Sequence, residues 1–117
     1  MKELIESQRN YFLAGHTRPI SARKKTLKKL HDLLLDNEEF LADAIYKDFK
    51  KPFYVTIENE LSLPYGEINR AKRKMRKWSR ASQFRTNLVN FPARSWTVPL
   101  PYGVSLVIGP WNYPYIP

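Results

Sequence analysis

The sequence predicts a mostly helical chain with two or three strands near its end, in the α/β fold class. Apolar residues recur at helical spacing up to about residue 80, and after Ser82 they begin to alternate with polar residues. Further along, residues 103–109 contain an apolar run without helical spacing, which is typical of a buried strand. The expected order is helices over about 2–80, a ribbon strand over about 94–98 and a sheet strand over about 103–109.

The first two helices are predicted from their ends. Residues 2–14 suit a helix that stops at Gly15, since glycine adopts the left-handed conformation of many helix ends. The Thr17 hydroxyl is expected to cap the next helix, with Pro19 in the first turn, where a missing N–H costs little. The apolar stripe of this second helix has four members: Ile20, Leu27, Leu30 and Leu34.

Two further helices are expected before the strands. The third should cover 38–49, because Asn37 and two acidic residues suit a helix amino terminus. Pro52 opens a fourth, long helix that runs toward Arg80. Pro64 lies inside it and removes one backbone hydrogen bond, so a kink or break is expected over 61–64.

The formal net charge of +9 raises the question of an anionic partner. Seven basic residues lie over 70–80, and on a helix they share one broad arc. The opposite arc is apolar and consists of Ile68, Ala71, Met75 and Trp78. No aromatic residue stands among the charges for base stacking, so a solvated helix face is favoured and no nucleic-acid partner is expected. A module that binds RNA or an anionic surface is kept as an alternative.

The rest of the composition bounds the class of protein. Hydrophobic residues make up 43% of the 117 and charged residues 26%, as in a globular protein. The absence of cysteine excludes a disulfide framework or thiolate metal site within these residues, and His16 and His31 have no cysteine partner, so no metal is expected. The amino terminus lacks a signal-peptide core and no segment is long and apolar enough for a membrane span, so a cytoplasmic location is expected.

The ribbon strand and the sheet strand end the chain. Residues 94–98 alternate, which places Ser95 and Thr97 on one face and Trp96 on the other. The sheet strand over 103–109 ends at Pro110, which lacks the N–H that a ladder needs. In α/β proteins ligands bind where strands end, so the polar Asn112 that follows is well placed to meet one. A common alternative for such an asparagine is a turn cap.

The motif Pro-Tyr-Gly-Val-x-Leu-Val-Ile-Gly-Pro-Trp-Asn-Tyr-Pro over 101–114 resembles the start of the Rossmann portion of the aldehyde dehydrogenase superfamily. With Tyr113 where many relatives have Phe, it is similar to the branch that handles fatty and aromatic aldehydes. Upstream, the pattern Gly-x-Thr-x-Pro-Ile-x-x-Arg over 15–23, then Glu60, Trp78 and Phe-Pro at 91–92 follow the order of that branch. The resemblance implies that residues 1–117 are an amino-terminal fragment, part of the cofactor-binding domain, with the catalytic domain absent.

The resemblance also implies a function. The full protein would oxidise an aldehyde to a carboxylic acid with NAD or NADP through a thioester on a cysteine. Asn112 would be the catalytic oxyanion donor, and Tyr113 would line the aldehyde tunnel. The cofactor would lie beside Ile108, Gly109, Pro110 and Trp111. The ribbon around Trp96 would help subunits pair, which implies a homodimer, whereas local packing of Trp96 is an equally weighted alternative.

Without a cysteine, the 117 residues alone are expected to be inactive. They are also expected to fold poorly alone, because the strand over 103–109 would lack the rest of its parallel sheet. A second alternative follows from the same observation. In it the chain is a remnant that only associates with intact subunits through the Trp96 ribbon.

Overall fold

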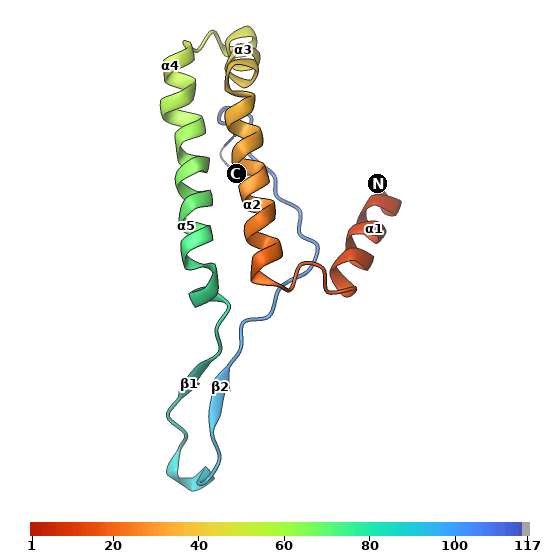
Figure 1. Cartoon of the computed structure of the whole chain (residues 1–117), viewed down its shortest axis with the longest axis vertical. Helices are drawn as coiled ribbons and strands as arrows, with labels where there is room; N and C mark the ends of the chain where they lie inside the picture. Colours follow the sequence, from red (N-terminus) through yellow and green to blue (C-terminus); the bar gives the residue numbers. More distant parts are fainter. Residues whose placement is uncertain (116–117) are drawn as a thin grey trace.

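The computed structural model describes residues 1–115 as an elongated molecule of 65 × 34 × 25 Å. Figure 1 shows helices first, then a hairpin, then a return segment. The elements are α1 (Lys2–Leu13), α2 (Ile20–Asp36), α3 (Glu38–Phe49), α4 (Phe53–Thr56), the π-helical turn η1 (Ile57–Leu61), α5 (Ser62–Trp78), β1 (Ser82–Phe84), the 3₁₀ turn η2 (Leu88–Asn90) and β2 (Ser95–Thr97). No helix of residues 1–115 is both long enough and apolar enough to cross a membrane.

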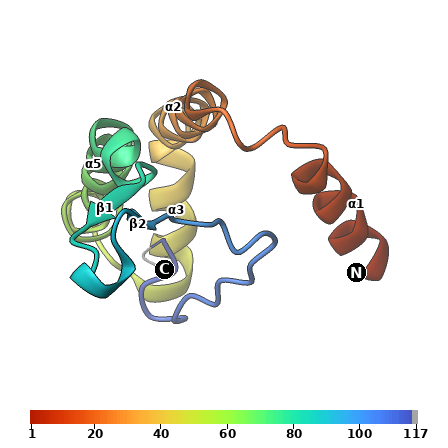
Figure 2. The same ribbon diagram turned by 90° about the horizontal axis from the view of Figure 1, so that it is seen from below.

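The body of the molecule is a helical hairpin capped by a third helix. The contacts join α2 to α5, and α3 to both α4 and η1 (Figure 1). Helix α1 stands apart from this body, and Figure 2 shows it separated from α2 by a linker. The buried apolar core is small: Ala42, Ile45, Leu61, Ile68 and Met75. The core residues belong to α3, η1 and α5, and these three elements are called the helical platform below.

The observed ends of the first three helices can be compared with the predicted ones. The predicted third helix is confirmed at Glu38–Phe49, and α1 ends just before Gly15, whose φ of 80° is left-handed. The predicted role of Thr17 is wrong. Helix α2 begins after Pro19, which stands at the cap position with φ −63°, and no side chain caps it. Thr17 lies two residues before the cap position, so its hydroxyl is not where a capping side chain must stand.

The predicted break over 61–64 takes another form. The helix that starts at Phe53 continues through Pro64 to Trp78, but it widens into a π turn at Ile57–Leu61. In this turn the Ser62 N–H bonds to the Ile57 carbonyl, five residues back. Pro64 would meet the carbonyl of Glu60 in a regular helix and has no N–H for it. The wide turn accommodates the proline without ending the helix.

The amphipathic design of α5 is confirmed for its central residues. Ile68 and Met75 are buried, and the basic residues on the other arc are largely exposed. Trp78 was predicted on the apolar side but is 52% exposed, because it is the last residue of the helix. The charged arc therefore faces solvent along most of its length.

The strands form a hairpin that projects from the helical body (Figure 1). The predicted ribbon strand over 94–98 is present as β2, Ser95–Thr97, and it pairs antiparallel with β1. Strand β1 was not predicted, since three residues between turns carry little pattern. Trp96 lies opposite Gln83 and is 56% exposed, so it is not packed away locally.

Residues 103–109 do not form the predicted strand within the described residues 1–115. They are irregular and have no strand partner, and the side chains of Leu106 and Ile108 are 85% and 83% exposed. A strand needs a neighbouring backbone to satisfy its N–H and C=O groups. The only described strands near it are already paired with each other, so the apolar run stays open here.

Candidate functional site

The predicted site residues lie on a turn that docks against the helical platform. After β2 the chain runs back along the helices (Figures 1 and 2), and residues 111–115 lie against α3. The turn closes where the Tyr113 N–H donates to the Pro110 carbonyl at 3.3 Å. Trp111 and Asn112 are therefore the two central residues of a tight turn.

A single ammonium group ties this turn to the platform. Lys51 lies in the short connection between α3 and α4, where Lys50 ends α3 with a left-handed φ of 57°. The Lys51 Nζ donates to the Asn112 carbonyl at 3.2 Å and to Glu60 Oε1 at 2.7 Å. It also lies 4.6 Å from the centre of the Tyr113 ring, within cation–π range. One side chain thus contacts two successive residues of the turn.

Glu60 is the unusual member of this cluster. Its side chain is fully buried, whereas that of Lys51 is 25% exposed. Its second oxygen, Oε2, has no hydrogen-bond partner among residues 1–115, and neither has the buried Thr56 Oγ1 nearby on the same helix. A buried carboxylate without a partner is strongly unfavourable, so the ion pair with Lys51 holds both groups in place.

Two aromatic residues, one before and one after Asn112, contact α3. The Trp111 ring stacks on Phe49, with ring centres 6.5 Å apart and an angle of 13°. The Tyr115 hydroxyl donates to the Leu41 carbonyl at 3.2 Å. Burial raises the pKa of the Tyr115 hydroxyl, and the negative charge of Glu60 raises it further. The hydroxyl therefore stays protonated and able to donate well above neutral pH.

Asn112 itself is exposed, and only its main chain is tied down. Its carbonyl accepts from Lys51, but its side-chain amide makes no hydrogen bond to any group of residues 1–115. The amide is thus available at the surface of a held turn. Tyr113 beside it is 43% exposed, and Trp111 is 81% exposed.

The proposed cofactor contacts divide into two groups. The structure brings Trp111 next to Asn112 and Tyr113 on the docked turn. Ile108, Gly109 and Pro110 lead into the turn, which Pro110 starts, and all three residues are exposed. An open backbone of this kind allows close approach of a ligand but does not define one.

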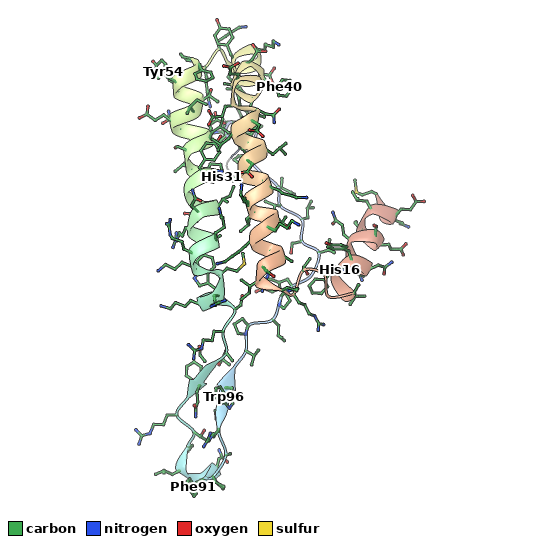
Figure 3. All side chains as sticks on the ribbon, viewed as in Figure 1. His16, His31, Phe40, Tyr54, Phe91 and Trp96 are labelled. Atoms are coloured by element: carbon green, nitrogen blue, oxygen red, sulfur yellow. The ribbon has the colours of Figure 1, made fainter. Side chains whose placement is uncertain are left out.

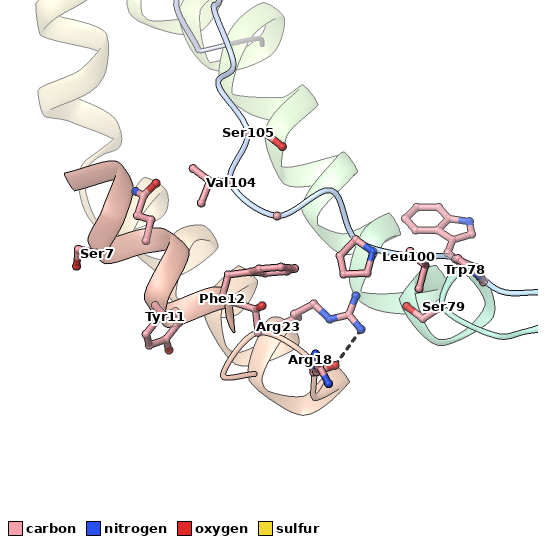
Figure 4. A pocket seen from close by; sticks show the side chains of 15 residues that line it. Ser7, Tyr11, Phe12, Arg18, Arg23, Trp78, Ser79, Leu100, Val104 and Ser105 are labelled. Atoms are coloured by element: carbon pink, nitrogen blue, oxygen red, sulfur yellow. Dashed lines mark hydrogen bonds between the residues drawn. The ribbon is translucent and has the colours of Figure 1, made fainter. Parts of the chain in front are cut away.

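A separate cleft lies away from this turn. It has a volume of about 1220 Å³ and opens between α1 and the segment 99–105 (Figure 4). Phe12 and Arg23 line it, and the Arg23 guanidinium donates to the Arg18 carbonyl at 3.1 Å. It contains neither Asn112 nor any carboxylate, so it offers no chemistry that matches the predicted site.

Further titratable side chains lie outside the turn, and Tyr65 and Glu38 connect helices of the body. The Tyr65 hydroxyl donates to Glu38 Oε1 at 2.7 Å, and burial together with this carboxylate raises the pKa of Tyr65. His31 packs against the Tyr65 ring at 5.2 Å, while His16 lies far away near α1 (Figure 3). Among residues 1–115 there is no group of three His, Asp or Glu side chains that could hold a metal ion.

The sequence interpretation missed Lys51 as a site residue and gave Glu60 no chemical role. A signal for Glu60 was present, because it directly precedes Leu61 on the stripe that continues to Ile68 and Met75. A carboxylate on the buried arc of a helix needs a cation. The sequence does not reveal which of 20 Lys and Arg residues supplies it.

Comparison with known proteins agrees with the motif. The sequence model described as the aldehyde dehydrogenase family matches residues 1–116. The chain is 31% identical over 112 residues to aldehyde dehydrogenase family 3 member B1 of Bos taurus, covering 96% of this chain and 24% of that protein. It is 32% identical over 114 residues to the 4,4'-diapolycopene-4,4'-dial dehydrogenase of Cytobacillus firmus, covering 97% and 25%.

A third relative is aldehyde dehydrogenase family 3 member B2 of Mus musculus, with 34% identity over 110 residues, 94% of this chain and 23% of that protein. The chain belongs to the aldehyde dehydrogenase family. It spans about a quarter of the length of the curated relatives that it matches. The predicted resemblance is thus confirmed at the level of the family.

Proposed function

We propose that residues 1–117 act within a longer polypeptide that oxidises an aldehyde to a carboxylic acid with NAD or NADP. That longer chain is called the complete polypeptide below. Membership of the family supports the reaction class, and relatives about four times longer support the need for further residues. The observation that carries the proposal is the docked turn with the free amide of Asn112.

Asn112 is the proposed oxyanion donor. When a nucleophile adds to an aldehyde carbon, the carbonyl oxygen gains negative charge, and a fixed N–H donor stabilises it. An amide that is already bonded to its own turn would have to break that bond first. The Asn112 amide is bonded to no group of residues 1–115, while its main chain is held by Lys51, so it is available in a fixed place. This supports the donor role over a turn cap.

The remaining chemistry requires groups outside these residues. The 117 residues contain no cysteine, so the attacking thiol must come from elsewhere in the complete polypeptide, and residues 1–117 alone are predicted to be inactive. A nicotinamide cofactor, when bound, would accept hydride from the aldehyde carbon. The exposed backbone of Ile108 and Gly109 and the open face of Trp111 fit a flat cofactor ring at close approach.

The proposed substrate class rests on the residues beside the amide. Trp111 and Tyr113 flank Asn112 in the sequence, and the two residues are 81% and 43% exposed. Exposed aromatic surface next to the amide suits an apolar aldehyde, fatty or aromatic, better than a charged one. Two curated relatives are named for action on 4,4'-diapolycopene-4,4'-dial and 4,4'-diaponeurosporen-aldehyde, which supports this choice.

Partners and location belong to the same proposal. The β1–β2 ribbon exposes Trp96, Val89 and Phe91 at 56%, 88% and 82%, and a second subunit could cover them in a homodimer. We place the protein in the cytoplasm. Neither alternative is favoured: the basic arc of α5 is the solvent face of a packed helix, and the family match extends through residue 116.

The experiment is to purify the native product from its source, measure its intact mass and assay reduction of NAD and NADP with a fatty and an aromatic aldehyde. The expected result is a mass about four times that of residues 1–117 and aldehyde-dependent cofactor reduction. A polypeptide of the expected length with no activity on either aldehyde would contradict the proposal.

A further inference from the structure

One ammonium group connects a buried acid to the proposed catalytic turn. The Lys51 Nζ lies 2.7 Å from Glu60 Oε1 and 3.2 Å from the carbonyl oxygen of Asn112. Glu60 is 9 residues from Lys51, whereas Asn112 is 61 residues away. The contact therefore joins the end of the chain to a part of the fold that forms locally.

The position of Lys51 is fixed from several sides. It lies between Lys50, the residue after α3, and Pro52, the residue before α4, and the following proline restricts its backbone. Its ammonium group lies 5.4 Å from the ring centre of Phe49 and 4.6 Å from that of Tyr113. Glu60 has no other hydrogen-bond partner among residues 1–115, so its charge keeps the ammonium group in this place.

Residues on both sides of Asn112 also contact α3. Trp111 stacks on Phe49, and the Tyr115 hydroxyl bonds to the Leu41 carbonyl. These contacts hold the residues on both sides of Asn112 against α3. The bond from Lys51 is the one that acts on Asn112 itself, and it acts on the carbonyl, which leaves the side-chain amide free.

We propose that Lys51, held by Glu60, is a positioning residue that sets the place of the Asn112 amide for the reaction. The inference rests on the proposed function of Asn112 as oxyanion donor. A donor stabilises a developing charge only when it is held at the correct place before reaction, and a displacement of about 1 Å can cost on the order of 10² in rate. Glu60 holds the ammonium group, and the ammonium group holds the backbone of the donor.

The test is a double-mutant cycle in the complete polypeptide. The rate of NAD(P)H formation in a single turnover is measured for the wild type, Lys51→Met, Asn112→Ala and the double variant. If Lys51 acts through Asn112, K51M lowers the rate roughly 10- to 100-fold in the wild-type background and less than about twofold in the N112A background. An equal loss in both backgrounds, or no loss in either, would overturn the positioning role.

Failure of the two proposals gives different patterns. An Asn112→Ala variant with the wild-type rate would refute the donor role, and the positioning role with it. If N112A lowers the single-turnover rate and K51M lowers it further by the same factor as in the wild type, only the positioning role is refuted. A purely structural effect of K51M moves stability without this dependence on Asn112.

Conservative variants keep the test decisive if K51M does not fold. Glu60→Gln keeps the shape of the side chain and removes its charge, and Lys51→Arg keeps the cation. We expect E60Q to lower the single-turnover rate and K51R to retain more of it than K51M, with no effect of E60Q in the N112A background. Lys47→Met is the matched control, since Lys47 is exposed and its ion pair among residues 1–115 is with the exposed Asp43. Loss of rate in K47M equal to that in K51M would overturn the proposal.

Discussion

Two neighbouring segments of the same motif behave differently. Residues 103–109 lie open and irregular, whereas residues 111–115 are docked on α3 and on Lys51. The first segment depends on backbone pairing with other strands, which the described residues do not supply. The second depends on side-chain contacts with α3 and with Lys51, which lies in the connection between α3 and α4. A turn anchored by side chains is thus established by these residues alone, while a strand is not.

The largest effect is expected where the open segment should become buried. If residues 103–109 pair in a parallel sheet of the complete polypeptide, Leu106→Asp would place a charge in a strand covered on both faces. The free energy of unfolding should then fall by roughly 4 kcal/mol or more, seen as loss of soluble folded protein. Leu100→Asp, in the predicted turn before the strand, is the control and should be tolerated. An L106D protein with unchanged thermal unfolding would show that 103–109 is no buried strand.

The docked turn should be most sensitive at its ion pair. Lys51→Met leaves the fully buried Glu60 without its partner, and we expect the free energy of unfolding to fall by about 3 kcal/mol. The double variant K51M with Glu60→Leu should recover much of this loss, because it removes the unpaired charge as well. Urea unfolding of the complete polypeptide measures both. A K51M protein as stable as the wild type would contradict the role given to the pair.

A smaller effect is expected at the far end of the turn. Tyr115→Phe removes the hydrogen bond to the Leu41 carbonyl, which is worth about 1 kcal/mol. The amide proton of Tyr113, which closes the turn, should then exchange faster with solvent, while those of α5 should not change. Tyr102→Phe is the control, since Tyr102 is fully exposed. Equal exchange rates in wild type and Y115F would mean that this anchor is not used.

The smallest effect is expected for Tyr65 in the helical body, because its contribution to stability changes only at alkaline pH. The folded pKa of Tyr65 is raised by burial and by Glu38, so the folded state retains a proton that the unfolded state loses. This contribution is complete below the ordinary tyrosine pKa of about 10 and is lost as the pH rises above it. Tyr65→Phe should flatten the decline of stability above that pH. The same slope in both proteins would contradict the assignment.

Part of the fold and the family could be predicted from helix-end residues and from the motif over 101–114. The start of α3 followed from Asn37 and the two acidic residues after it, and the family followed from the motif around Asn112. The π turn did not follow, because a proline signals a disturbed helix without showing its form. The Lys51 contact did not follow either, since it joins residues 61 apart and depends on how two turns meet.

The strand β1 shows a further limit of pattern alone. Ser82–Phe84 is too short for alternation to be visible, and it exists because β2 pairs with it. The predicted strand at 103–109 shows the reverse case, with a clear pattern but no partner among the described residues. In both cases the backbone partner decides the outcome.

The most direct test of the central claim is the rate of aldehyde oxidation by the complete polypeptide with Asn112→Ala. If the free amide on the docked turn is the oxyanion donor, kcat should fall on the order of 10²- to 10³-fold with little change in the affinity for aldehyde. Asn10→Ala, on the exposed helix α1, should retain the wild-type kcat. A wild-type kcat in N112A would contradict the account.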